Sequence, residues 1–478
     1  MTSPRAELSQ SSSKQSSSNQ SSSNRSSSSS NRKLILAGQI AFLPTGILQT
    51  LLGPMLPILI ARWALNDTQA GYLFLVQFLA SLAGVQLSGL LLTRWGFRPA
   101  FLWGLLLMAC GVSTLLLGSS TLGMAAVAAY GLGLGLLVPS DNLLIAEIGS
   151  GSSSDSGAAS QESSQRSSQE RSQRSSQRSS EASSRASAVS LLNFFWGVGA
   201  VFCSVAVFCS VKVAWAAAHH LLPFFLGSVA LFLVLLAFAM RNLPFPAAAT
   251  SSATPAATSS VTPAESSPSS SSLTPSPSPS STSASSPSWR ELAKSPAIWI
   301  FAAIFFLYTG AETAVGGWIG SYVSRLGSHG AAMASIASIA PLMPAFFWTA
   351  LTVGRALGTA FLRHFSERSV LRAGYGAGAA GIGLMLWAPT LTGVIGGALI
   401  TGLSFATLYP ITVARLSQRF GVAARKIGAV MFSLAAVGPA VIPWMVGVIS
   451  HSTGSLRAGL LLPLGATVIL FLVHLFEW

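Results

Sequence analysis

The sequence contains very little charge. Only 8% of its 478 residues are Asp, Glu, Lys or Arg, whereas 51% are hydrophobic, and the mean hydropathy is positive at +0.59. Soluble globular domains have roughly 25% charged residues, so this composition excludes the soluble classes. A bilayer accommodates such a chain, because helices of roughly 20 apolar residues satisfy their own backbone amides in hydrocarbon. We therefore expect an all-α integral membrane protein.

Residues that carry chemistry are also scarce. The three cysteines, Cys110, Cys203 and Cys209, fall inside apolar stretches at no spacing that fits a metal site or a disulfide framework. The sequence has no nucleophile elbow, no phosphate-binding glycine loop and no paired carboxylates that suggest a cleft. We therefore expect no enzyme, no catalytic residue, no bound metal and no cofactor beyond a coupling H⁺ or Na⁺. ATP-driven transport is not expected either.

Long apolar stretches recur along the chain and predict twelve transmembrane helices. The first stretch follows a polar leader and is far longer than a signal-peptide core, so it should remain as the first helix. The predicted spans are 34–61, 70–93, 99–118, 121–146, 187–211, 221–240, 297–323, 341–362, 370–388, 391–413, 427–449 and 455–476.

The basic residues indicate how the spans are oriented. The net charge of +14 would suggest nucleic acid in a soluble protein, but here the Lys and Arg residues lie in short connections. With both termini in the cytoplasm, 22 of the 27 fall inside, Arg355 alone lies in a span, and Arg62, Lys212, Arg325 and Arg457 fall outside. Cytoplasmic connections are rich in Lys and Arg, so this asymmetry supports an even helix count and cytoplasmic termini.

Three polar segments divide the chain. Residues 1–31, 149–186 and 242–294 lack the apolar content that would offset the entropy of ordering, so we expect them to be disordered and cytoplasmic. The third separates two predicted six-helix bundles, 32–241 and 295–478. The second is rich in Ser, Gln and Arg and could bind RNA or acidic lipid, although a solvated tether explains it more simply.

A weak internal repeat supports two related bundles. Gly131-Leu132-Gly133 precedes Pro139 in the fourth span, and Gly402-Leu403-Ser404 precedes Pro410 in the tenth at the same offset. Parallel repeats related by an axis along the membrane normal would place such pairs at corresponding positions.

Two charged residues lie near the middle of predicted spans. Glu312 is in the seventh span and Arg355 in the eighth. A charge at this depth costs at least about 2.5 kcal/mol on insertion scales, so such residues usually face a cavity and have a role. Glu312 could bind solute or couple transport to an ion, with Arg355 as its partner. The simpler interpretation is a permanent ion pair that holds two helices together.

Other charges lie at the cytoplasmic ends of spans. Asp141 and Glu147 belong to the fourth span, and Arg94 and Arg98 flank the connection between the second and third. These four residues could form an inner gate, or they could be ordinary solvated charges at helix ends.

Amides and aromatic residues complete the candidate solute site. Amides offer both donors and acceptors, which suits a hydroxylated ligand, and aromatic faces can pack on a sugar ring. Singly, however, an aromatic residue in a membrane helix more often serves packing or anchoring at the interface. With Glu312, the candidate substrate-binding residues are Gln39, Gln49, Asn142, Asn193, Trp196, Tyr308, Trp318 and Tyr409.

Several motifs carry a resemblance to a known family. They are Gly131-Leu-Gly-Leu-Gly through Asn142, Leu192-Asn193 with Gly197 and Gly199, the segment 308–322, Val353-Gly354-Arg355 and Tyr409-Pro410. The chain resembles the major facilitator superfamily, and within it the fucose, galactose and hexose porters. The resemblance implies two six-helix bundles around a central solute site that includes Asn193 and Glu312.

The chain also departs from this family's pattern. Gly89, Arg94, Gly96 and Arg98 match the signature loop between the second and third helices, but Thr93 stands where that motif has aspartate. Val138 stands where fucose transporters have a glutamate, and the first span contains no acid.

Together these features predict a secondary transporter. We expect alternating access for a small polar solute, a sugar or related metabolite, coupled to H⁺ or Na⁺. The protein would be a monomer in the plasma (cell inner) membrane. Its partners would be the bilayer and the solute, without nucleic acid. The alternatives are efflux of amphipathic compounds, a lipid flippase, or a receptor or scaffold that transports nothing.

Overall fold

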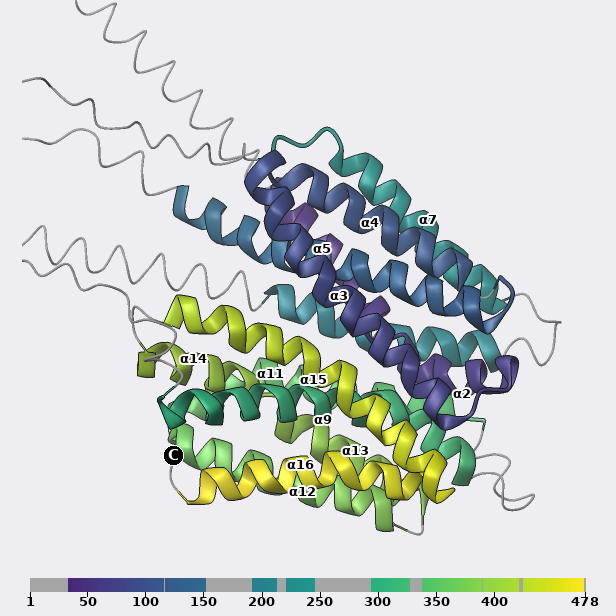
Figure 1. The fold of residues 1–478 in the computed structure, drawn as a ribbon, viewed down its shortest axis with the longest axis vertical. Helices are drawn as coiled ribbons and strands as arrows, with labels where there is room; N and C mark the ends of the chain where they lie inside the picture. Colours follow the sequence, from purple (N-terminus) through teal and green to yellow (C-terminus); the bar gives the residue numbers. More distant parts are fainter. Residues whose placement is uncertain are drawn as a thin grey trace, which may run out of the picture.

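All regular structure in the described part of the chain is helical. The computed structural model describes residues 33–115, 117–151, 191–212, 221–245, 294–326, 338–388, 390–420 and 424–476 (Figure 1). The helices are Lys33–Thr50, α2 (Leu52–Trp63), α3 (Asp67–Trp95), α4 (Phe97–Thr114), α5 (Ser120–Gly151), Leu191–Lys212, α7 (Leu221–Met240), α9 (Pro296–Leu326), the short 3₁₀ helix η1 (Ala340–Leu342), α11 (Met343–His364), α12 (Glu367–Trp387), α13 (Leu391–Phe405), α14 (Leu408–Phe420), α15 (Ala424–Thr453) and α16 (Leu456–Leu475).

A helix or a broken helix lies at each of the twelve predicted spans. Ten are long and apolar enough to cross a membrane, with α13 and α14 taken as one, and the bent pair Lys33–Thr50 and α2 makes an eleventh. These helices make the chain a multi-pass integral membrane protein. Helix α12 does not meet that criterion, since it begins with Glu367 and Arg368 and is rich in glycine and alanine. A twelfth crossing and cytoplasmic termini therefore stay predictions.

The helices form two groups side by side (Figure 1). The first half comprises the helices between residues 33 and 245, in which α5 packs against α3 and α4, and α7 covers α4. The second half comprises those between 294 and 476, in which α9 packs against α15, α16 and α11. The halves meet where α3 contacts α15 and α2 contacts α9. The predicted tail, insertion and linker lie almost entirely outside the described residues.

Glycines allow the helices of the first half to approach closely. A Cβ added at Gly131 or Gly135 would collide with the backbone of α3 at Gln77 or Ser81, and one at Gly133 would collide with α4 at Gly104. Small residues at helix interfaces have this role in membranes, because lipid provides no hydrophobic drive for association. The glycine run in α5 therefore positions α5 against α3 and α4 at once.

Two spans are broken, one in each half. Lys33–Thr50 bends by 41° into α2, and α13 ends at Phe405 before α14 begins at Leu408. Proline follows each break, Pro54 in the first turn of α2 and Pro410 in the first turn of α14, where its missing N–H is tolerated. By contrast, α5 continues through Pro139, so the two halves of the predicted repeat differ at this point.

A side chain from a neighbouring helix satisfies a carbonyl beside each break. The amide of Gln77 donates to the backbone oxygen of Gln49 at 3.1 Å, and the hydroxyl of Tyr308 donates to that of Phe405 at 2.9 Å. An unpaired carbonyl in hydrocarbon costs several kcal/mol, so these bonds stabilise the broken spans.

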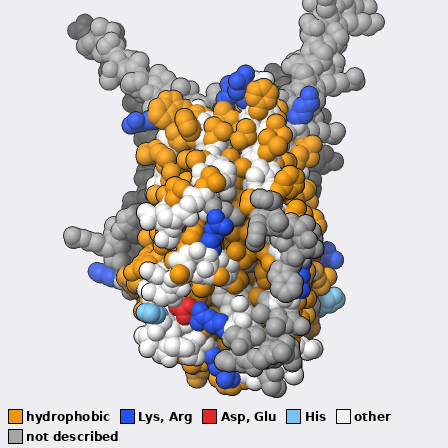
Figure 2. All heavy atoms as spheres, turned by 90° about the vertical axis from the view of Figure 1, so that its right-hand side faces the viewer, with side chains coloured by type: hydrophobic (Ala, Val, Ile, Leu, Met, Phe, Trp, Pro, Cys, Tyr) orange, Lys and Arg blue, Asp and Glu red, His pale blue; other side chains and the backbone are white. Residues whose placement is uncertain are grey.

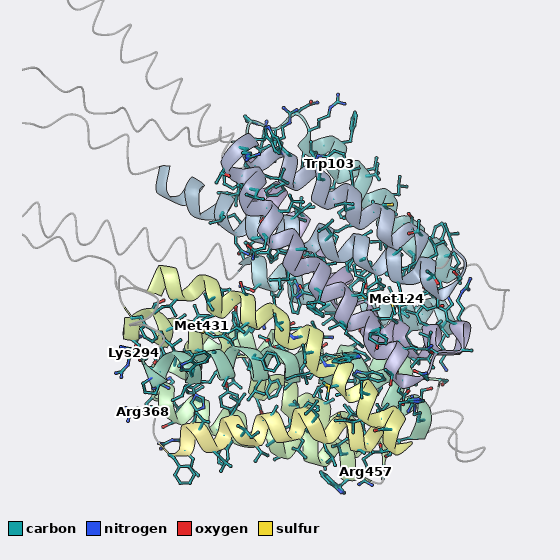
Figure 3. The ribbon with its side chains drawn as sticks, in the orientation of Figure 1. Trp103, Met124, Lys294, Arg368, Met431 and Arg457 are labelled. Atoms are coloured by element: carbon teal, nitrogen blue, oxygen red, sulfur yellow. The ribbon has the colours of Figure 1, made fainter. Side chains whose placement is uncertain are left out.

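The exterior of the molecule is apolar. Large hydrophobic side chains are exposed on most helices, including Phe224 and Phe238 on α7, and hydrophobic side chains with scattered Lys and Arg cover much of the face in Figure 2. Lys294 and Arg368 lie at one end of the second half and Arg457 at the other (Figure 3). This arrangement agrees with the predicted topology, in which the first two share one side of the membrane.

Candidate functional site

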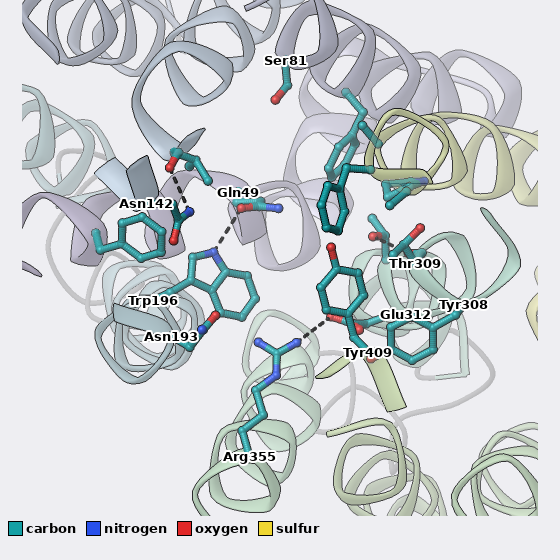
Figure 4. A pocket seen from close by; sticks show the side chains of 18 residues that line it. Gln49, Ser81, Asn142, Asn193, Trp196, Tyr308, Thr309, Glu312, Arg355 and Tyr409 are labelled. Carbon is teal, nitrogen blue, oxygen red and sulfur yellow. Dashed lines mark hydrogen bonds and ion pairs between the residues drawn. The ribbon is translucent and has the colours of Figure 1, made fainter. Parts of the chain in front are cut away.

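A cavity of about 350 Å³ lies between the two halves. The first half lines it from Lys33–Thr50, α3, α5 and Leu191–Lys212, and the second half from α9, α11, α14 and α15 (Figure 4). Its polar lining residues are Gln49, Ser81, Asn142, Asn193, Thr309, Glu312, Thr313 and Arg355, and its aromatic lining residues are Phe42, Phe78, Trp196, Tyr308, Tyr409 and Phe432. A cavity of this size accommodates a small molecule that both halves contact.

Glu312 and Arg355 form an ion pair in the wall of the cavity that the second half provides. The Arg355 guanidinium lies 3.6 Å from the Glu312 carboxylate, with side chains 22% and 13% exposed. The same guanidinium lies over the ring of Trp196, with its central carbon 5.5 Å from the ring centroid, which is a cation–π arrangement. Arg355 therefore contacts an acid of its own half and an aromatic ring of the other half.

Trp196 is fixed in place by its neighbours. Its indole N–H donates to the side-chain oxygen of Gln49 at 3.1 Å, and Trp348 packs edge-on at 5.5 Å between ring centroids. Gln49 is one residue from the end of the first broken helix, beside the carbonyl that Gln77 satisfies. Tyr130 in turn donates to Gln77 at 3.2 Å, so a chain of hydrogen bonds connects the cavity wall to α5.

Seven of the nine predicted substrate-binding residues line this cavity. Gln39 and Trp318 do not. Gln39 is buried within the first half, and Trp318 is fully buried, where its indole N–H donates to the backbone oxygen of Pro443 at 2.9 Å. Both predictions relied on residue type alone, and the face that a residue occupies depends on how its helix packs.

The predicted gate residues do not come together among the described side chains. Asp141 is fully buried against Gly38, and neither of its oxygens accepts a hydrogen bond from a described residue. Arg98 instead donates to the backbone oxygen of Arg241 at the end of α7, and Arg94 is exposed. Helix α5 runs through Glu147, whose side chain lies outside the described residues. The inner gate therefore stays a prediction without support from this geometry.

Several cavity residues were not predicted. Thr309 and Thr313 lie within one turn of Glu312 on α9, and Ser81 lines the cavity from α3. Thr309 lies three residues before Glu312 and Thr313 lies four residues after Thr309, a helical spacing that could have identified the two threonines. In the described segments, no cluster of three or more His, Cys, Asp or Glu side chains could hold a metal ion.

Two sequence comparisons give partial matches. Residues 102–216 match a family described as a domain of unknown function (DUF8070). The Saccharomyces cerevisiae protein "Bypass of stop codon protein 6" is 32% identical over 190 residues, which cover 35% of this chain and 35% of that protein. The match thus spans about a third of the relative's length.

Solved structures match almost the whole chain. The nucleoside transporter NupG superposes with a TM-score of 0.65 at 14% identity, covering 93% of this chain and 99% of its own. A bacterial homologue of the human lysosomal transporter Spinster, in an inward-facing conformation, gives 0.62 at 12% identity, with 93% and 96% coverage. The Escherichia coli fucose:proton symporter FucP gives 0.55 at 16% identity, with 94% and 99% coverage.

These neighbours define the fold. The chain has the fold of major facilitator superfamily transporters, as the sequence motifs predicted. Identities this low show the fold alone.

Proposed function

We propose that this protein is a secondary transporter that moves a small polar solute through the cavity by alternating access. The observation that carries this proposal is the cavity itself, which lies between the two halves and is lined by side chains from both. A solute bound there contacts both halves, so its binding energy can favour one arrangement of the halves over another. NupG, FucP and Spinster are all named as transporters, which supports a transport role for this fold.

The lining favours an uncharged, hydroxylated solute such as a sugar or a related metabolite. Gln49, Asn142 and Asn193 provide amide donors and acceptors, and Trp196 provides a flat face. The opposite charges of Glu312 and Arg355 already neutralise each other, so an uncharged solute does not need to supply a counter-charge.

Glu312 is the candidate coupling residue, with Arg355 as its partner. A carboxylate beside a guanidinium can exchange its partner for H⁺ or Na⁺ when the solute or the conformation changes the distance between them. We place the protein in the plasma membrane, with both termini in the cytoplasm, an orientation that the asymmetry of its basic residues favours.

The test first identifies a solute that binds and then measures the effect of replacing Glu312 on its transport. A thermal-shift screen of sugars, nucleosides and polar metabolites identifies binders, because a ligand that binds only the folded state stabilises it. The purified protein in proteoliposomes should then accumulate a binder when a proton or sodium gradient is imposed. Glu312→Gln should abolish accumulation and leave solute exchange intact.

The matched control is Glu367→Gln, which removes an acid at the start of α12, away from the cavity. It should accumulate solute as the wild type does. Accumulation by Glu312→Gln at the wild-type level would rule out the coupling role, and the absence of both uptake and extrusion for every binder would contradict transport itself.

Efflux of amphipathic compounds is the second candidate, and the phenyl rings of Phe42, Phe78 and Phe432 in the lining favour it. Extrusion of a dye with no uptake of sugars would support this alternative.

A flippase would instead need an opening between the halves toward lipid. Deleting residues 152–186, after the end of α5, separates a transporter from a scaffold, because a transporter should keep its flux.

A further inference from the structure

A second ion pair joins the two halves at one end of the molecule. Both oxygens of Asp67, the first residue of α3, accept hydrogen bonds from the guanidinium of Arg325 in the last turn of α9. The hydroxyl of Ser450 on α15 also donates to Asp67. Such two-pronged pairs fix orientation as well as position. We call Asp67, Arg325 and Ser450 the cross-half cluster, since α3 belongs to the first half and the other helices to the second.

The cross-half cluster lies beyond the cavity, on one side of it. On α3 it is 11 residues from Phe78, on α9 12 residues from Thr313, and on α15 11 residues from Pro439, all of which line the cavity. At 1.5 Å per residue, each helix separates the cluster from the cavity by about 16 to 18 Å. The cluster therefore lies at about the same distance from the cavity along all three helices.

The helices between the cavity and the cross-half cluster are in close contact. A Cβ added at Gly71 on α3 would meet the backbone of Trp444, and one added at Gly447 on α15 would collide with the backbone oxygen of Asp67. The rings of Phe74 and Trp318 also meet across the halves, with centroids 6.1 Å apart. The described residues thus close this stretch with backbone and ring contacts.

A further polar contact joins the halves near this end. Lys212, the last residue of its helix in the first half, donates to the hydroxyl of Ser338 at 2.8 Å, just before η1 in the second half. Lys212 is exposed and Ser338 is partly exposed, so this bond contributes less than the partly buried cluster, in which the Asp67 side chain is 11% exposed.

We propose that the cross-half cluster is the gate that keeps the solute cavity closed toward this end. The proposal rests on the transport function above, because alternating access requires the halves to separate here when the cavity opens to this side. Separation breaks the ion pair, and water then solvates both charges. A partly exposed pair suits this role, since it stabilises the closed arrangement without making it permanent.

Site-specific labelling tests the gate without any solute. Thr313→Cys places a thiol on the cavity wall in a full-length chain whose native cysteines are replaced, Cys203 by Ala and Cys110 and Cys209 by Ser. The labelling rate with a membrane-impermeant maleimide is measured from the Asp67 end in oriented proteoliposomes. Ser119→Cys, exposed in the connection between α4 and α5, identifies that end. Trp63, four residues before Asp67, lies against Gly123 in the first turn of α5, so this connection is at the Asp67 end.

The expected result is slow labelling of Thr313→Cys from this end and a rate on the order of tenfold faster when Asp67→Asn or Arg325→Gln is added, equivalent to about 1.4 kcal/mol. The pair acts as a unit, so the double variant D67N/R325Q should label no faster than the faster single variant. Arg325→Lys, which keeps the charge, should recover most of the closure and shows that the chain folds. Arg457→Gln, a cation on Trp387 within the second half, should have no effect.

Two results would overturn the gate. One is that Thr313→Cys, with the cross-half cluster intact, is labelled as fast as Ser119→Cys, which would mean that this end is open. The other is single variants that label at the unmodified rate. Neither result bears on whether the protein transports a solute, and a protein that transports nothing can still show gated labelling, so the two proposals fail separately.

Discussion

The two ion pairs described above have the same chemistry in different surroundings. Glu312 and Arg355 lie on α9 and α11 of one half, 3.6 Å apart in the wall of the cavity. Asp67 and Arg325 lie on different halves, beyond the cavity. A pair within one half can persist while the halves move, so it can respond to solute or ion. A pair between halves must break whenever the halves separate at that end.

The largest expected effect concerns stability. Arg355→Ala leaves Glu312 without its partner inside the protein, so we expect a loss of about 3 kcal/mol in the free energy of unfolding. Arg325→Ala should cost less, roughly 1 kcal/mol, because water reaches that guanidinium. Chemical denaturation in detergent measures both, with Arg363→Ala at the exposed end of α11 as control. Equal losses for Arg355 and Arg325 would remove the distinction between the two pairs.

The close contact beside the cross-half cluster gives the next largest effect. Gly447→Ala introduces a methyl group against the backbone oxygen of Asp67, and overpacking of this kind costs about 2 kcal/mol. The closed arrangement should lose that stability, so Thr313→Cys should label roughly thirtyfold faster from the Asp67 end. Gly465→Ala on α16 adds its methyl to open space and is the matched control. An unchanged labelling rate in Gly447→Ala would show that closure does not depend on this contact.

A smaller effect is expected at the cavity. Trp196→Phe keeps an aromatic face beneath Arg355 and loses the hydrogen bond to Gln49, a change of about 1 kcal/mol. The apparent affinity for solute in an exchange assay should fall roughly fivefold, with no change in gate labelling. Trp103→Phe, on the exposed face of α4, should match the wild type (Figure 3). Faster gate labelling in Trp196→Phe would show that the cavity and the gate are not independent.

The smallest effect is expected from the exposed link between the halves. Lys212→Met removes the bond to Ser338, and exposed contacts of this kind contribute about 0.2 to 1 kcal/mol. The labelling rate of Thr313→Cys should rise by no more than about fivefold. A change as large as that of Asp67→Asn would assign the gate to both contacts together.

The helices could be predicted from the sequence more completely than their bends. The predicted span 221–240 coincides with α7, because its apolar stretch is bounded on both sides by polar residues. The breaks after Thr50 and Phe405 were missed, since apolar residues continue through both and only Pro54 and Pro410 indicate an interruption. Hydropathy predicts which segments are apolar enough to lie in the membrane, whereas a bend depends on local backbone geometry.

The site could be predicted where a residue conflicts with its surroundings. Glu312 and Arg355 were identified because charges are rare within apolar spans. Asp67 was not, because it lies where charge is common, at the start of a helix, and its partner Arg325 is 258 residues away. Nothing in the local sequence of either residue indicates that the fold brings them together.

The hydrogen bonds beside the two breaks make the halves mechanically unequal. In the first half Gln77 holds the carbonyl of Gln49 and is itself held by Tyr130, so α3 and α5 brace the bent span together. In the second half Tyr308 braces the carbonyl of Phe405, and it lies one turn from Glu312 on α9. A rotation of α9 that follows a change at Glu312 would therefore release the break between α13 and α14. The backbone amides of Ala406 and Thr407 should exchange hydrogen faster than those around Leu51, and solute should widen that difference.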